Sequence, residues 1–259
     1  MNTIHTSTTT RTAYTPLSTL AAIWLIARRQ MIEALWTRSS LVMFGVSLVI
    51  NTFVVWSTIQ PIMRSNSSTS TLVVGNTLAF LLLLVALLNG QPAIGIAAGV
   101  FAGDKERGCL LPLLATPASN TALLAGKVLG AVIPALLYTI AGIIVYLIEL
   151  VLLFGTATLA LMPLGLSLAS VAFIPALFIF AATIASLISS RVATFQSAQT
   201  YSSLITTALW LIFGALVFVG GFFALWIFVV GILVAYLLDG LLILLAARTW
   251  QREEVMAKQ

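Results

Sequence analysis

Long apolar stretches alternate with short polar segments along the whole chain. Six such stretches cover about 41–60, 72–101, 128–154, 164–188, 201–219 and 222–247. Each reaches the roughly 20 apolar residues that a helix needs to cross the hydrocarbon core of a bilayer. The pattern therefore predicts an all-α integral membrane protein with six transmembrane helices.

A mixed segment precedes the first apolar stretch. Residues 16–40 combine Trp24, Trp36 and several leucines with Arg28, Arg29 and Glu33. This mixture is typical of an amphipathic helix lying in the membrane interface, although a cytoplasmic extension of the first span is an alternative. We expect residues 1–15 to be a flexible polar tail without the features of a cleaved signal peptide, and residues 16–259 to form a single transmembrane domain.

Prolines and glycines mark the span ends and bends. Pro61 is expected to end the first span, whereas Pro92, Pro134 and Pro175 lie within later spans, where proline commonly kinks a helix. Gly220 and Gly221 alone separate the fifth and sixth stretches. This short connection predicts either a tight hairpin outside the cytoplasm or a re-entrant piece.

Composition and charge strengthen the membrane assignment. The chain is 61% hydrophobic and 7% charged, with a mean hydropathy of +1.13, which excludes an ordinary soluble domain. With both termini in the cytoplasm, every Lys and Arg except Arg64 falls on the cytoplasmic side. This bias predicts a multi-pass protein of the cytoplasmic (inner) membrane, in contact with lipid and not with nucleic acid. Because the chain has one cysteine and one histidine, we expect neither an internal disulfide nor a His/Cys metal cluster.

The connection between the second and third spans, residues 102–127, carries the most distinctive pattern. Four consecutive charged residues, Asp104 to Arg107, precede a leucine-rich patch, and Ser119 or Asn120 is suited to cap the next helix. We expect a charged turn, a short amphipathic helix and a second helix start to form a structured cytoplasmic knob. The alternative is a solvated loop with interfacial leucines.

This stretch resembles the signature region of the type-2 ABC transporter permeases. The matching fragments are Glu106-Arg107-Gly108, Leu113-Leu114, Thr116-Pro117, Ser119 and Gly126-Lys127, whereas Cys109-Leu110-Leu111-Pro112 departs from the family pattern. The resemblance implies a coupling helix that docks on a separate ABC ATPase subunit, in an exporter with two ATPases and two copies of this permease or of a related one. The coupling residues implied are Asp104, Lys105, Glu106, Arg107, Gly108, Leu113, Leu114, Thr116, Pro117 and Lys127.

No nucleotide-binding motif of the form G-x-x-x-x-G-K-[ST] occurs in the chain, so we expect a transport subunit and not an enzyme. ATP and Mg would be bound by the partner subunit, and we expect no cofactor in this chain. An apolar or amphipathic substrate is preferred because the candidate path residues are mostly uncharged.

Small and polar residues inside the spans suggest packing and transport roles. Gly95, Gly99 and Gly103 form a small-residue stripe, expected to pack against the N-terminal amphipathic helix or a moving neighbour. The resemblance places the path along the second and fifth spans, although Ser and Thr also bond to their own helix. The candidates for the path are Asn89, Gln91, Gln199, Ser203, Thr206, Thr207, Trp210 and Asp239.

Two acids lie within apolar stretches. Asp239 stands roughly 13 Å before Arg248 along the last span, near the midplane, where a charge costs at least about 2.5 kcal/mol. We therefore expect a gating role, with a protonated core acid as the alternative. Glu149 is expected near the outer interface, roughly 33 Å beyond Lys127. The main alternative function is an ion-coupled secondary transporter that uses Asp239. A membrane enzyme is disfavoured because the chain lacks catalytic and metal-binding motifs. A membrane scaffold without transport activity is a further alternative.

Overall fold

The structure is a computed structural model that describes residues 18–64, 71–108, 119–192, 194–204, 207, 208, 211, 215 and 225–249. These residues form helices and contain no strand, which confirms the all-α class. The helices are α1 (Thr19–Trp36), α2 (Arg38–Arg64), α3 (Thr71–Gly99), α4 (Ala102–Glu106), α6 (Asn120–Phe154), α7 (Ala157–Ala160), α8 (Leu164–Arg191) and α10 (Leu225–Thr249). Residues 195–204 are also helical.

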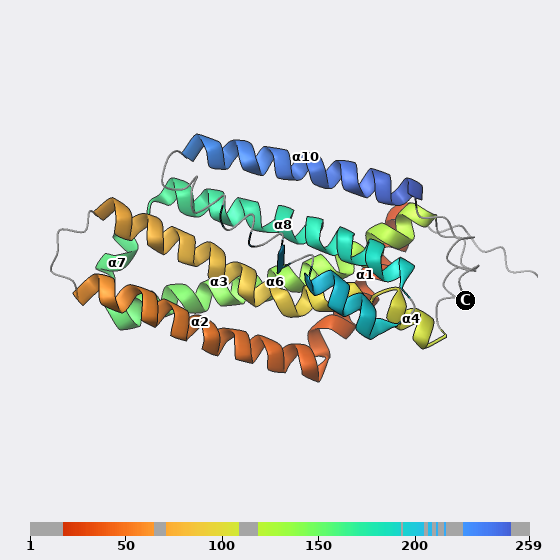
Figure 1. Cartoon of the computed structure of the whole chain (residues 1–259), viewed down its shortest axis with the longest axis horizontal. Helices are drawn as coiled ribbons and strands as arrows, with labels where there is room; N and C mark the ends of the chain where they lie inside the picture. Colours follow the sequence, from red (N-terminus) through yellow and green to blue (C-terminus); the bar gives the residue numbers. More distant parts are fainter. Residues whose placement is uncertain are drawn as a thin grey trace, which may run out of the picture.

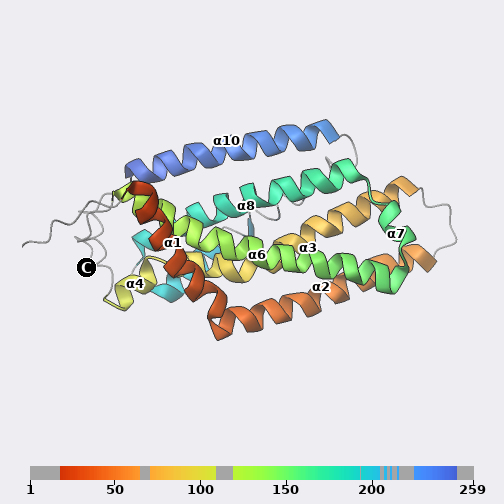
Figure 2. The ribbon, with the colours of Figure 1, turned by 180° about the vertical axis from the view of Figure 1, so that it is seen from behind.

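The long helices α2, α3, α6, α8 and α10 run side by side along the length of the molecule (Figure 1). The short helix α4 lies at one end of this bundle, and α7 lies at the other. Helix α1 crosses α6 obliquely at the same end as α4 (Figure 2). The predicted amphipathic helix is therefore a separate helix, divided from α2 at Thr37, and not an extension of the first span.

Within the described residues, four helical segments are long and apolar enough to cross a membrane. They are Arg38–Met63, Thr71–Gln91, Thr121–Phe154 and Leu164–Arg191, and a shorter apolar segment, Val229–Leu245, lies in α10. These correspond to the first four predicted spans and to part of the sixth. The predicted fifth span, 201–219, and the Gly220-Gly221 connection lie largely or wholly outside the described residues, so the count of six stays a prediction.

The prediction that Pro61 ends the first span is wrong. Helix α2 continues through Pro61 to Arg64. Proline removes one backbone hydrogen bond and crowds the carbonyl four residues earlier. Only three residues of α2 follow Pro61, and these two effects do not prevent them from staying helical. Pro134 and Pro175 likewise lie inside α6 and α8.

Small residues and hydrogen bonds fix how the helices pack. A methyl group on Gly130 of α6 would lie 2.5 Å from Cβ of Gln30, so this glycine lets α1 approach closely. Between α3 and α6, the Tyr146 hydroxyl donates to the Leu78 carbonyl at 2.8 Å and the Thr139 hydroxyl to the Ala86 carbonyl at 2.9 Å. Such bonds between helices contribute about 0.6 kcal/mol each in a membrane.

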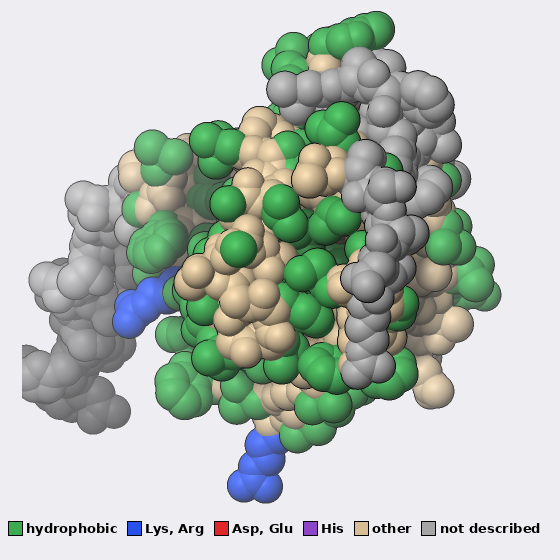
Figure 3. Space-filling view, turned by 90° about the vertical axis from the view of Figure 1, so that its left-hand side faces the viewer, with side chains coloured by type: hydrophobic (Ala, Val, Ile, Leu, Met, Phe, Trp, Pro, Cys, Tyr) green, Lys and Arg blue, Asp and Glu red, His purple; other side chains and the backbone are tan. Residues whose placement is uncertain are grey.

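The outer surface of the bundle is apolar. Figure 3 looks onto the end that carries α7 and shows mainly hydrophobic side chains and backbone, with Lys and Arg visible only at the margin. Large apolar side chains such as Leu152 of α6 and Leu164 of α8 are more than 70% exposed. An apolar surface of this extent is suited to lipid and not to water.

Candidate functional site

Helix α4 carries the charged residues of the connection between α3 and α6. The sequence predicted a charged turn here, and the structure shows a helix of five residues, Ala102–Glu106, with Asp104 in its first turn. A carboxylate in the first turn stabilises a helix because the free backbone N–H groups there are partly positive. Gly108 ends it with φ +68, and its N–H donates to the Lys105 carbonyl at 3.1 Å.

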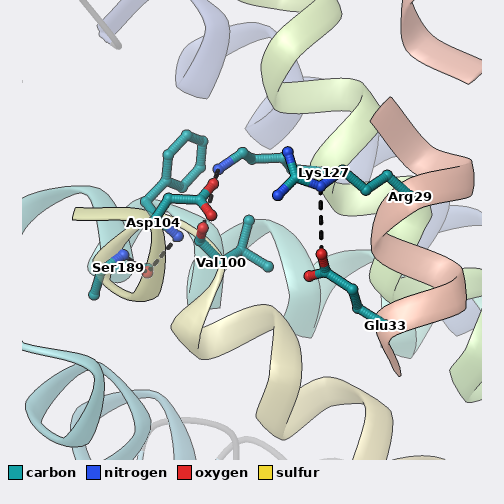
Figure 4. A network of polar contacts seen from close by, with 8 residues as sticks. Arg29, Glu33, Val100, Asp104, Lys127 and Ser189 are labelled. Atoms are coloured by element: carbon teal, nitrogen blue, oxygen red, sulfur yellow. Dashed lines mark hydrogen bonds and ion pairs between the residues drawn. The ribbon is translucent and has the colours of Figure 1, made fainter. Parts of the chain in front are cut away.

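Asp104 forms an ion pair with Lys127 of α6. The Lys127 Nζ lies 2.6 Å from Asp104 Oδ2, donates to the Val100 carbonyl at 3.0 Å and stands 4.0 Å from the centre of the Phe101 ring (Figure 4). Lys127 is only 2% exposed. It therefore fastens α4 to α6 from within, and its assignment to the coupling residues stays a prediction.

Lys105 and Ser189 join the α4 region to the end of α8. The Lys105 Nζ donates to the carbonyls of Ser190 and Val192 at 3.0 and 3.4 Å, where a cation complements the partial negative charge of a helix C-terminus. The Ser189 hydroxyl accepts from the backbone N–H groups of Phe101 and Ala102, both at 3.0 Å. The turn between α3 and α4 is thus held against α8.

Glu106 links α4 to a third element, the helical segment 195–204. Its Oε1 accepts a hydrogen bond of 2.8 Å from the Phe195 N–H in the first turn of that segment. Thr194 caps the same turn, because its hydroxyl accepts from the Ser197 N–H at 3.2 Å. Three successive side chains of α4, at positions 104 to 106, therefore contact three different helical elements: α6 about two turns from its start, the end of α8, and the start of the segment 195–204.

A second ion pair lies on α1, close to the Asp104 and Lys127 pair (Figure 4). Arg29 Nε stands 3.3 Å from Glu33 Oε1, and both side chains are well exposed. An exposed pair of this kind contributes little to stability, at most about 1 kcal/mol. It adds charge to this end of the molecule without fixing the position of α4.

The other predicted coupling residues divide into two groups. Arg107 and Gly108 are exposed at the end of α4. Leu113, Leu114, Thr116 and Pro117 lie outside the described residues, as does the expected amphipathic helix. Ser119, and not Asn120, caps α6, because its hydroxyl accepts from the Ala122 N–H at 3.2 Å.

The glycine stripe of α3 and α4 packs against the segment 195–204. A methyl group on Gly99 would lie 1.8 Å from a ring carbon of Phe195, one on Gly103 would lie 3.4 Å from that ring, and one on Gly95 would lie 3.7 Å from Gln199 Nε2. The neighbour of these glycines is this segment and not α1. Helix α1 instead packs on Gly126 and Gly130 of α6, a pair with the same spacing.

Asn89, a candidate for the path, lies in the interior of the single chain. It is fully buried, accepts from the Ser47 hydroxyl at 2.9 Å, donates to the Val85 carbonyl at 2.9 Å and packs against Gly142. It therefore joins α2, α3 and α6 inside one chain.

The remaining path candidates lie in different surroundings. Gln199, Ser203 and Thr207 are exposed and Gln91 is partly buried, whereas Thr206 and Trp210 lie outside the described residues. Asp239 is 4% exposed, and neither carboxylate oxygen has a hydrogen-bond partner in the described part of the chain. The structure thus brings Gln199 beside α3 but leaves Asp239 apart, on α10.

Sequence reasoning missed Ser189 and Phe195, which complete the contacts of α4. Both follow or end apolar stretches, and nothing in their neighbourhood distinguishes them from other span-end residues. Ser189 bonds to the N–H groups of Phe101 and Ala102, and Phe195 bonds to Glu106. These contacts join residues 87 to 89 positions apart, so no local pattern could have found them.

Residues 24–229, well over half of the chain, match the family described as ABC-2 family transporter protein. No individual curated protein matches the chain. The matched region includes α4, Lys127, the end of α8 and the segment 195–204.

Proposed function

The chain belongs to the ABC-2 transporter family, and we propose that it is the permease of an ATP-driven exporter powered by a separate ATPase subunit. Family membership makes the chain the membrane-embedded subunit of a transporter, and its apolar helices agree with a multi-pass membrane protein. The proposal adds the energy source, the direction of transport and the site of coupling.

The arrangement of α4 is the observation that carries this proposal. Arg107 and Gly108 are exposed at its end, whereas the side chains at positions 104 to 106 bond to α6, the end of α8 and the segment 195–204. A partner that displaces α4 would displace all three elements with it. Helix α4 is therefore suited to pass a movement from a cytoplasmic partner to the membrane helices, which can repack between two discrete arrangements.

The path is proposed to run along α3 and the segment 195–204. These elements meet at Gly95 and Gln199, next to the contacts of α4, so movement of α4 would reach them directly. Gln199, Ser203 and Thr207 are exposed in the single chain and are available to face a second permease copy. We therefore place the path between two permease copies and not inside one.

Co-purification tests the proposal. The chain, tagged at its C-terminus and expressed from its native operon, is expected to bring down an ATPase subunit in roughly equal amount. The complex is expected to hydrolyse ATP. A chain that purifies alone, from a locus without an ATPase gene, would overturn the proposal.

Asp239 supports a second candidate function, an ion-coupled secondary transporter. Its buried carboxylate lies on a membrane helix, where an ionisable residue is a functional candidate because its charge is costly. Transport in sealed vesicles with an imposed proton gradient and no ATP, abolished by Asp239→Asn, would favour this function. Transport that requires ATP and survives Asp239→Asn would exclude it.

A further inference from the structure

Glu149 lies at the level of the middle of α2. Its Oε1 accepts a hydrogen bond from the Thr52 hydroxyl. Thr52 stands about 21 Å along α2 from Arg38 and about 18 Å from Arg64, at about 1.5 Å per residue. Along its own helix, Glu149 stands only about 7.5 Å before the end of α6 at Phe154, at about 1.5 Å per residue, so the expected position near the outer interface stays a prediction.

The contact between α2 and α6 at this level holds polar groups without partners. Glu149 Oε2 is buried and has no hydrogen-bond partner among the described residues. The Glu149 carboxylate also forms no ion pair with any of these residues. Asn51, next to Thr52 on α2, is 2% exposed, and neither its Nδ2 nor its Oδ1 has a partner there. Buried polar groups in folded proteins are nearly always paired, so the unpartnered carboxylate oxygen of Glu149 points to a bound group.

The surface beside Glu149 is apolar and aromatic. Trp56 lies one turn beyond Thr52, and its ring centre stands 6.1 Å from that of Phe154 on α6. On α2, Val49 and Phe53 are about 70% exposed. A carboxylate thus stands beside a lipid-facing aromatic pair, and the faces of aromatic rings attract cations.

We propose that the contact between α2 and α6 binds a lipophilic organic cation, with its charge at Glu149 and its apolar part against Trp56 and Phe154. A positive charge offsets the cost of a carboxylate in apolar surroundings. A metal ion fits less well, because the described residues contain no group of three His, Cys, Asp or Glu side chains that could hold one. This inference rests on the proposed function, since it names a class of molecule for the transporter.

Binding of tetraphenylphosphonium to the purified chain in lipid nanodiscs tests this site, with empty nanodiscs as the background. We expect saturable binding, and we expect Glu149→Gln to weaken it about tenfold, the factor that corresponds to about 1.4 kcal/mol. The amide oxygen of Gln can still accept from Thr52, so the variant keeps the fold. Glu33→Gln, which removes an exposed carboxylate on α1 away from this contact, is the control and should leave the affinity unchanged.

Tetraphenylborate, an anion of nearly the same shape, separates charge recognition from partitioning. We expect Glu149→Gln not to weaken its binding. Three results would overturn the proposal: no saturable tetraphenylphosphonium binding, equal affinity in the wild type and Glu149→Gln, or an equal loss in Glu33→Gln. The assay uses neither ATP nor an ATPase, so its failure would leave the permease proposal standing, and a failure of co-purification would leave the cation site standing.

Discussion

Lys127 and Asp104 form an ion pair of 2.6 Å at the junction of α4 and α6, but they are not equally buried. The Lys127 side chain is 2% exposed, whereas that of Asp104 is 21% exposed. Water can therefore solvate Asp104 when its partner is lost, whereas an unpaired Lys127 would stay largely dehydrated. The energetic consequences of removing the two partners should differ.

We expect Asp104→Asn to lower the free energy of unfolding by about 3 kcal/mol, because it leaves a buried ammonium without its counter-charge. Lys127→Met keeps the apolar length of the side chain and should cost about 1 kcal/mol. The double variant should be more stable than Asp104→Asn alone. Denaturant titration of the purified proteins in detergent measures all three, and equal losses in the two single variants would contradict the asymmetry.

Gly99 and Gly103 form a matched pair for testing the contact between α3 and the segment 195–204. Gly99→Ala places a methyl group 1.8 Å from the Phe195 ring and should cost about 2 kcal/mol through overpacking. Gly103→Ala meets the ring at 3.4 Å and should be nearly neutral. Adding Phe195→Leu to Gly99→Ala should restore part of the lost thermal stability, and no recovery would show that the ring is not the obstacle.

Glu106 should protect the first turn of the segment 195–204. Its carboxylate accepts from the Phe195 N–H, and losing such a bond costs about 1 kcal/mol, which corresponds to about fivefold in an opening equilibrium. Hydrogen exchange at Phe195 should therefore be about fivefold faster in Glu106→Ala. Glu106→Gln, which keeps an acceptor oxygen, should exchange nearly as slowly as the wild type. Equal exchange in all three proteins would contradict this contact.

The helices could be predicted from sequence because an apolar stretch in a bilayer must satisfy its backbone internally, and a helix does so. The Ser119 cap was also accessible, since a helix start is a local pattern. The direction in which a polar side chain of α3 points could not be predicted, because α3 is apolar on all sides and its sequence distinguishes no buried face from an exposed one. The sequence therefore could not predict that Asn89 lies inside the bundle.

Contacts between distant segments account for the other differences. The Gly126-Lys127 motif places Lys127 among the coupling residues. Its burial, however, depends on Val100, Phe101 and Asp104, which pack around it from more than 20 positions away in the sequence. The contact of Glu149 with Thr52 joins residues 97 positions apart, so spacing along α6 could not predict it. Sequence spacing gives distance along one helix but not the level of its neighbour.

A photo-cross-linking amino acid placed at Arg107 tests the central claim most directly. Position 107 is exposed at the end of α4, and Arg38, an exposed basic residue at the start of α2, is the matched control position. In membranes from the native host, position 107 should give an adduct that contains an ATPase subunit, whereas position 38 should not. Absence of that adduct at position 107 in a correctly inserted chain, or equal adducts at both positions, would contradict coupling through α4.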